Sequence, residues 1–140
     1  MSKVAVVYWS GTGNTKLMAE AVLKGAVDKG AEASIFEAND FSPSKVGDFD
    51  SIAFGCPAMG AEELEDSEFE PMFSAVEGEL SGKQVVLFGS YGWGDGQWMR
   101  DWEDRCKKSG ITLAADSVLA NETPDDEDLA ACNALGASIV

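Results

Sequence analysis

The sequence contains no histidine, and it has neither paired cysteines nor a long apolar run. Without histidine, Ser–His–Asp catalysis, Cys–His catalysis and phosphohistidine chemistry are excluded. The three cysteines, Cys56, Cys106 and Cys132, are widely spaced and form no CxxC pair, so the usual zinc and iron–sulfur patterns are absent too. We expect three buried or idle reduced thiols and no metal site.

Basic residues are also scarce, with 10 Lys and Arg against 25 Asp and Glu and a net charge of −15. This charge repels phosphate groups, which argues against nucleic acid and membrane surfaces as partners and favours proteins with a basic face. Solubility alone is the alternative explanation of the charge. The apolar run 4–9 is too short for a signal peptide or a membrane span, so we expect a cytoplasmic protein.

What the sequence does have is a regular alternation of strand and helix signals over its 140 residues, which predicts one domain, 1–140. Strands are expected at 3–9, 32–37, 50–55, 83–89 and 111–119. Helices are expected at 14–29, 67–76, 96–109 and 125–138, with a short helical turn within 39–48. In the first helix, one apolar face is expected to hold Leu17, Met18, Ala21, Val22 and Ala26. Strand–helix–strand units give parallel pairing, so the fold class is α/β with a doubly wound parallel sheet.

The stretch SGTGNT, residues 10–15, follows the first strand and opens the first helix. A helix N-terminus with close-approaching glycines binds phosphate through backbone N–H groups. The stretch is not a Walker A loop, because it lacks the lysine, and it is not GxGxxG, because Lys16 replaces the third glycine. It predicts a site for a terminal phosphate dianion held without magnesium. A glycine-rich turn with Ser and Thr caps is the alternative.

Two further loops, 56–63 and 90–96, follow the third and fourth strands and should emerge at the same carboxyl edge of the sheet. Ligands bind there, where the strand order reverses. The first of these loops carries Met59, and the second carries Trp93 between two glycines. We therefore expect a slot for a flat aromatic ring with a phosphate tail. Ordinary core packing is the alternative for Trp93, and it is the expected role of Trp98 and Trp102 on the next helix.

The stretches YWSGTGNT (8–15), GCPAMGAEELEDSEFEP (55–71) and FGSYGWGDGQWMRDW (88–102) resemble the short-chain bacterial flavodoxins of the clostridial type. The resemblance extends over essentially the whole chain. It implies a flavodoxin-like three-layer sandwich with a five-stranded sheet in the order 2-1-3-4-5. Flavodoxins with their FMN are themselves a standard example of the rule that places a ligand at the strand-order reversal.

The resemblance also implies FMN as the cofactor. The residues that it places at FMN are Ser10, Gly11, Thr12, Gly13, Asn14, Thr15, Pro57, Ala58, Met59, Gly60, Glu62, Ser90, Tyr91, Gly92, Trp93 and Gly94. Residues 10–15 would hold the phosphate, while Met59 and Trp93 would pack on the two faces of the isoalloxazine ring. Glu62 would accept a hydrogen bond from flavin N3–H. On reduction, the backbone at Met59–Gly60 would turn the Gly60 carbonyl toward flavin N5.

The sequence departs from relatives at two positions. Pro57 stands where some relatives have serine, which removes one possible hydroxyl. Ala61 stands where others have Asp or Ser, so it has no polar side chain to support that backbone rotation. The implied function is low-potential transfer of single electrons between redox proteins by a monomer that is not an enzyme. Acidic runs at 62–79 and 122–128 lie near the expected site, whereas Lys3, Lys29, Lys45 and Lys83 are expected at the opposite edge. The alternatives are an FMN-dependent NAD(P)H reductase and a response-regulator receiver. A receiver has acidic residues after its first strand and a phosphate-accepting Asp after its third. This chain has Ser10 and Cys56 at those two positions, which argues against a receiver.

Overall fold

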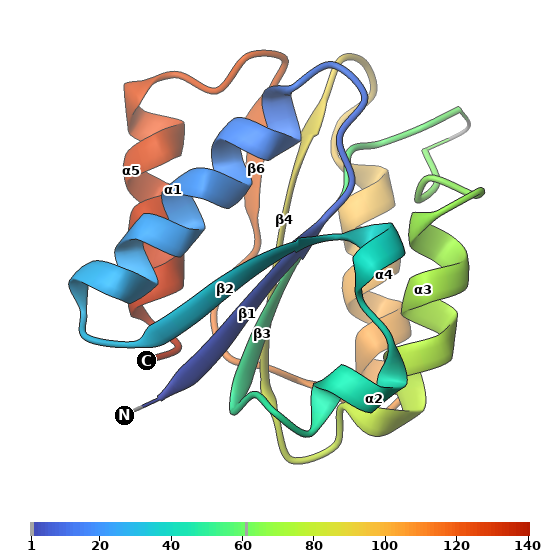
Figure 1. Ribbon diagram of the computed structural model, residues 1–140. Coiled ribbons are helices and arrows are strands. Elements are labelled where there is room, and N and C mark those ends of the chain that lie inside the picture. Colours follow the sequence, from blue (N-terminus) through green and yellow to red (C-terminus); the bar gives the residue numbers. More distant parts are fainter. Residues whose placement is uncertain (1, 61) are drawn as a thin grey trace.

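The computed structural model describes residues 2–60 and 62–140 and shows a parallel sheet between two layers of helices (Figure 1). The strands are β1 (Lys3–Tyr8), β2 (Glu32–Glu37), β3 (Ser51–Gly55), β4 (Gln84–Tyr91), β5 (Thr112–Leu113) and β6 (Val118–Asn121). The α-helices are α1 (Asn14–Asp28), α2 (Pro43–Val46), α3 (Phe69–Val76), α4 (Gln97–Lys108) and α5 (Asp126–Ala137), with 3-10 turns at Ala38–Asp40 and Glu77–Glu79. The predicted alternation of strands and helices is confirmed.

The sheet has the order β2-β1-β3-β4-β5 with every pair parallel, which confirms the fold class. The prediction of one continuous strand over 111–119 was wrong. Strand β5 pairs with the start of β4 and β6 pairs with its end. Residues 114–117 belong to neither strand, although Ala114 N–H still donates to the Val85 carbonyl at 2.9 Å. This segment reads Ala-Ala-Asp-Ser, and Ala and Asp are poor strand residues. The Ser117 hydroxyl instead donates to Glu103 of α4, 2.7 Å away.

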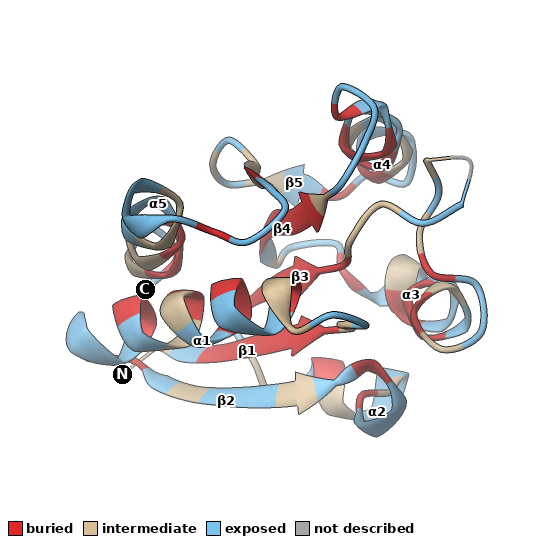
Figure 2. Ribbon diagram, turned by 90° about the horizontal axis from the view of Figure 1, so that it is seen from above, coloured by how far each residue is buried: buried red, intermediate tan, exposed pale blue. Residues whose placement is uncertain are grey.

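Helices α1 and α5 cover one face of the sheet (Figure 2). The two helices approach so closely that a Cβ at Gly25 would overlap the Asn133 carbonyl, and one at Gly136 would overlap the Val22 carbonyl. The buried side of α1 consists of Thr15, Met18, Ala19, Val22, Gly25 and Ala26. The prediction that Leu17 belongs to this face was wrong: it is 44 % exposed, because it lies about 100° around the helix from Met18.

Helices α3 and α4 cover the opposite face, where a cluster of aromatic side chains fills the core. Trp98 and Trp102 are 1 % and 2 % exposed, so their predicted structural role is confirmed. Arg105 joins the two helices through ion pairs to Glu70 at 2.7 Å and Glu77 at 3.0 Å. These bonds and contacts fix α3, and therefore the end of the loop that precedes it, against α4.

All three cysteines are free and buried, as expected. Burial raises the pKa of Cys106 and of Cys132 to about 12, and raises the pKa of Cys56 further still, so the thiols stay protonated at neutral pH. In the part of the chain that the structure describes, no helix combines the length and the apolar character needed to cross a membrane. Within those same residues, no group of three or more side chains could hold a metal ion.

Candidate functional site

The loop 10–15 turns from β1 into α1 with Gly13 at φ +96°, a conformation that glycine adopts without strain. The Ser10 hydroxyl oxygen accepts hydrogen bonds from the N–H groups of Gly13 (3.1 Å) and Lys16 (3.3 Å). Thr12 Oγ1 accepts one from Asn14 N–H at 3.4 Å. The Ser10 hydroxyl can still donate its own hydrogen. The loop is therefore held by its own side chains around the start of α1.

Four backbone N–H groups of this loop, those of Ser10, Gly11, Thr12 and Thr15, find no acceptor among the described residues. Unpaired N–H groups at a helix N-terminus carry a partial positive charge and bind anions. Behind them, the buried hydroxyls of Thr15 and Ser90 hydrogen-bond to each other at 2.8 Å, which ties the loop to the end of β4. The loop presents neutral donors with no metal site beside it among the described residues.

The loop after β3 begins parallel to the end of β4, because Ala58 N–H donates to the Ser90 carbonyl at 3.0 Å. Met59 and Glu63 then pair through two backbone hydrogen bonds of 2.9 Å, closing a tight turn. Within it, Gly60 has φ +51° and Glu62 has φ +57°. Ala61, whose side chain bears on the expected rotation at Gly60, lies outside the described residues. Met59 is 37 % exposed at the carboxyl edge.

The base of this turn is anchored by Glu65, which is only 5 % exposed. Its carboxylate accepts hydrogen bonds from the N–H groups of Ser67, Glu68 and Phe69 and from the Ser67 hydroxyl. Burial alone would raise the pKa of Glu65, but these hydrogen bonds outweigh it and hold the pKa below its ordinary value. Glu65 N–H in turn donates to Cys56 Sγ at 3.4 Å.

The third loop is shorter than predicted, because β4 continues through Ser90 and Tyr91. It comprises residues 92–96, in which Gly94 and Gly96 have φ of +83° and +92°. None of its backbone N–H groups meets an acceptor among the described residues. Trp93 at its tip is 59 % exposed. The alternative, that Trp93 packs in the core, is therefore excluded, whereas its stacking role remains a prediction.

These loops surround a cavity of about 480 Å³, within the usual range of about 300–1,000 Å³ for small-molecule sites. Its lining comprises Trp9, Gly11, Thr12, Asn14, Pro57, Ala58, Met59, Ser90, Tyr91, Gly92, Glu122 and Thr123. Nine of these were predicted from the sequence. The other predicted residues are not among the lining residues: Ser10, Gly13, Thr15, Gly60, Glu62, Trp93 and Gly94.

Sequence reasoning missed Trp9, Glu122 and Thr123. Trp9 ends the apolar run of β1 and was counted with the strand, although it lies at the carboxyl edge. Glu122 and Thr123 follow β6, so the rule that singled out the loops after the other central strands could have found them. Glu122 N–H donates to the Tyr91 carbonyl at 2.7 Å, and its φ of +58° is unusual outside glycine.

Glu62, expected to accept from the flavin, does not line this cavity but lines a neighbouring pocket with Trp98, Trp102 and Arg105. Glu62 Oε1 is buried and has no hydrogen-bond partner among the described residues. It lies so close to Gly94 that a Cβ there would overlap it. A buried acceptor without a donor is unfavourable. The indole N–H of Trp102, which lines the same neighbouring pocket, is likewise buried without a partner among the described residues. The unpaired donor groups of the loop 10–15, at the start of α1, are compatible with the phosphate of a flavin phosphate.

Comparison with known proteins decides the family. The family model described as flavodoxin matches residues 6–136. The chain belongs to the flavodoxin family. The flavodoxin of Clostridium beijerinckii is 43 % identical over 123 residues, covering 88 % of this chain and 89 % of the relative. The Megasphaera elsdenii flavodoxin is 46 % identical over the same length and the same shares of the two chains.

A solved structure supports the same assignment for this flavodoxin chain. The solution structure of two-electron reduced Megasphaera elsdenii flavodoxin is 43 % identical and superposes with a TM-score of 0.89 over 97 % of each chain. The chain is therefore a flavin-based electron-transfer protein, and the family resemblance inferred from its three motifs is confirmed. As flavodoxins are electron carriers, the carboxyl-edge cavity is where the flavin is to be sought.

Proposed function

We propose that the chain binds FMN tightly and non-covalently, and that it carries one electron at a time between redox proteins without a substrate of its own. The observation that supports this most is that groups suited to a phosphate and groups suited to a flat ring lie in the loops around one cavity. At one end, N–H groups of an uncharged loop point to a phosphate, and at the other, Met59 and Trp93 are exposed where a flat ring could pack. When bound, FMN supplies the redox chemistry, taking up and releasing electrons singly.

The phosphate end binds through residues 10–15. The free N–H groups of Gly11, Thr12 and Thr15 donate to phosphate oxygens, and the helix N-terminus adds its partial positive charge. The Ser10 hydroxyl can donate as well. Because no Mg²⁺ is needed, the preferred anion is a terminal phosphate rather than a nucleoside triphosphate.

The ring end is formed by the loops 57–63 and 92–96. Met59 supplies a thioether surface for one face of the ring and Trp93 an indole for the other. Glu62 accepts from a ring N–H, and Gly60, with its positive φ, lets the adjacent backbone rotate at low cost. These residues orient the ring and keep water from its faces.

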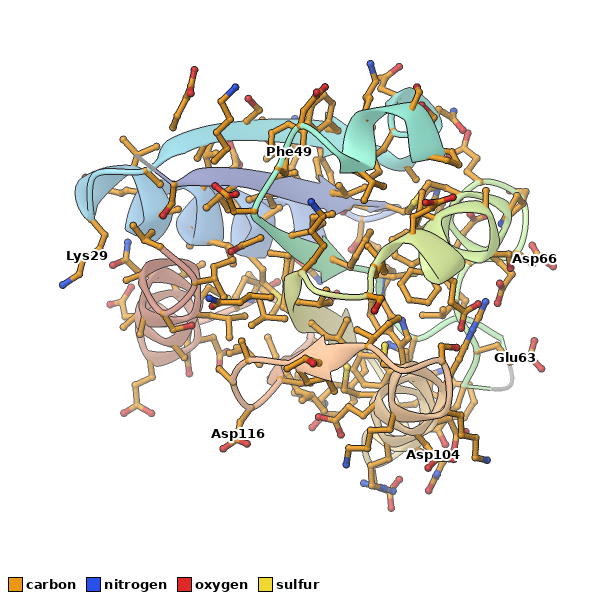
Figure 3. All side chains as sticks on the ribbon, turned by 90° about the horizontal axis from the view of Figure 1, so that it is seen from below. Lys29, Phe49, Glu63, Asp66, Asp104 and Asp116 are labelled. Carbon is orange, nitrogen blue, oxygen red and sulfur yellow. The ribbon has the colours of Figure 1, made fainter. Side chains whose placement is uncertain are left out.

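The charge distribution supports docking of redox proteins with a basic face. Glu63 and Asp66 point outward on the side of the molecule opposite Lys29 (Figure 3). Of the bases expected at the amino edge, Lys3 opens β1, Lys29 follows α1 and Lys83 precedes β4, as predicted. The resulting field would steer a basic partner toward the ring. Electron exchange with such a partner should slow as salt is added, and a rate independent of salt would contradict this part of the proposal.

The decisive test distinguishes this carrier from the alternative, an FMN-dependent reductase that uses NAD(P)H. The FMN-loaded chain is mixed with excess NADPH or NADH under nitrogen in a stopped-flow instrument. We expect no fast bleaching of the flavin absorbance, because the acidic runs at 62–79 and 122–128 repel a dinucleotide phosphate. Fast direct reduction would contradict the carrier proposal. A chain that takes up no FMN would contradict the whole function. We also propose that the carrier is a cytoplasmic monomer.

A further inference from the structure

Trp9 lines the cavity beneath the phosphate loop, and its indole ring supports the backbone of that loop. A Cβ placed on Gly11 would lie 3.1 Å from Cη2 and 3.3 Å from Cζ3 of Trp9, so the glycine backbone rests on the outer edge of the ring. The indole therefore fills the space beside Gly11 where a side chain would stand, and Gly11 is one of the residues whose backbone N–H has no acceptor among the described residues.

The orientation of that indole is set by one carboxylate. Trp9 Nε1–H donates to Glu68 Oε2 at 2.6 Å, a short distance typical of a hydrogen bond to a charged acceptor. The other oxygen, Glu68 Oε1, accepts from Asn39 Nδ2 at 2.8 Å. Glu68 N–H donates to the buried Glu65 carboxylate at 2.7 Å, which fixes its backbone. Both oxygens and the backbone of Glu68 are therefore held in place.

The ordinary explanation of a glutamate at this position is a cap for the helix that follows. Glu68 is indeed the N-cap residue of α3, but its side chain makes no capping hydrogen bond. Both carboxylate oxygens are turned away from the helix, toward Trp9 and Asn39. The N–H groups at the start of α3 are satisfied by Glu65 instead. Glu68 is thus free of the capping role and serves the indole.

We propose that Glu68 is a positioning residue for the phosphate loop. By holding the Trp9 N–H, it fixes the ring on which Gly11 rests and so determines how strongly the cavity prefers a phosphorylated flavin to an unphosphorylated one. The inference rests on the proposed FMN function and extends it. It also links the phosphate loop to the loop of Met59, because Glu65 anchors both Glu68 and the end of that turn.

The test measures the dissociation constants of FMN and of riboflavin, which lacks the phosphate, by calorimetric titration of the apoprotein. For Glu68→Leu we expect FMN to bind about tenfold to a hundredfold more weakly, the equivalent of about 1.5–3 kcal/mol for a hydrogen bond to a charged group. Riboflavin affinity should change less than threefold, because the ring end of the site is untouched. Trp9→Phe, which keeps a ring but removes the N–H, should show the same selective loss.

Three further variants distinguish positioning from general damage. Glu68→Gln keeps an acceptor for the indole and should restore most of the preference for FMN. The double variant Glu68→Leu/Trp9→Phe should lose no more than either single one, since both remove the same hydrogen bond. Glu79→Leu, a charge loss at an exposed site after α3, should leave both affinities unchanged.

Equal weakening of FMN and riboflavin by Glu68→Leu and by Trp9→Phe, or no change in either affinity, would overturn the inference while leaving FMN binding intact. If the wild-type chain bound neither flavin, the proposed function itself would fail. Should Glu68→Leu not fold, Trp9→Phe and Glu68→Gln decide the matter by the same ratio of affinities.

Discussion

The loops 10–15 and 92–96 border the same cavity, but the chain holds them in different ways. In the first, Ser10 and Thr12 accept hydrogen bonds from the loop's own backbone, and the Thr15 hydroxyl is tied to Ser90. In the second, no backbone N–H finds an acceptor among the described residues, and Trp93 is 59 % exposed. The phosphate end is thus built by the protein in advance, whereas the ring end is to be completed by the flavin.

The largest effect on stability should come from the contact between α5 and α1, the helix that follows the phosphate loop. In Gly136→Ala the new Cβ would overlap the Val22 carbonyl of α1, which forces the helices apart. We expect a loss of about 3 kcal/mol in the free energy of unfolding, which exceeds the gain of about 1 kcal/mol in helix propensity. Urea unfolding of the apoprotein measures it. Gly78→Ala, where a Cβ meets nothing within 4 Å, is the control and should change stability by less than about 0.5 kcal/mol.

At the ring end, Trp93→Ala should affect binding and not folding. Loss of the indole should weaken FMN about thirtyfold, which corresponds to about 2 kcal/mol of stacking. The apoprotein should unfold at the same urea concentration as the wild type, because the side chain packs on little of the protein. Calorimetric titration and urea unfolding give the two numbers. A clear loss of apoprotein stability would show that Trp93 is part of the fold after all.

The contribution of Glu65, at the end of the loop after β3, to the free energy of unfolding should depend on pH. Its pKa is lowered in the folded protein, so its carboxylate stabilises the fold above the unfolded-state pKa of about 4.3, and this contribution is lost as the pH falls through the folded value. Glu65→Gln should therefore cost about 2 kcal/mol at pH 7 and much less at pH 3. Urea unfolding at several pH values tests this. A difference between variant and wild type that stays constant from pH 7 to pH 3 would be incompatible with it.

The smallest effect concerns the buried hydroxyl pair behind the phosphate loop. Thr15→Val keeps the shape of the side chain but removes the partner of Ser90. We expect about 1 kcal/mol of lost stability and weaker FMN binding. Thr12→Val, at an exposed position, should reduce FMN affinity and cost less stability than Thr15→Val, because the hydrogen bond that it removes is exposed and 3.4 Å long. If both variants behaved alike, the phosphate end would not be the prebuilt part of the site.

The phosphate loop could be predicted from the sequence because its geometry depends on neighbours in the chain. Glycines at 11 and 13 and hydroxyls at 10 and 12 specify a helix start whatever lies around them. The same holds for the last helix, which was expected to begin at residue 125 and whose start Asp125 and Asp128 cap with their side chains. Trp93 was predictable as exposed for the same local reason, since it lies between two glycines.

What the sequence could not predict depends on residues far apart. Trp9 belongs to the cavity because Glu68, 59 positions later, holds its N–H. The division of the fifth strand arises from where β4 offers partners, and the exposure of Leu17 from the direction in which α1 meets α5. Pattern and propensity do not contain such pairings.

Stepwise reduction of the FMN-loaded chain tests the central claim most directly. Reducing equivalents are added under nitrogen while the visible absorbance and the potential are recorded. An electron carrier of the proposed kind predicts one FMN per chain, reduced in two separate one-electron steps, with the second at low potential because the acidic surroundings of the site disfavour added negative charge. Reduction in a single two-electron step, or failure to retain FMN on gel filtration, would contradict it.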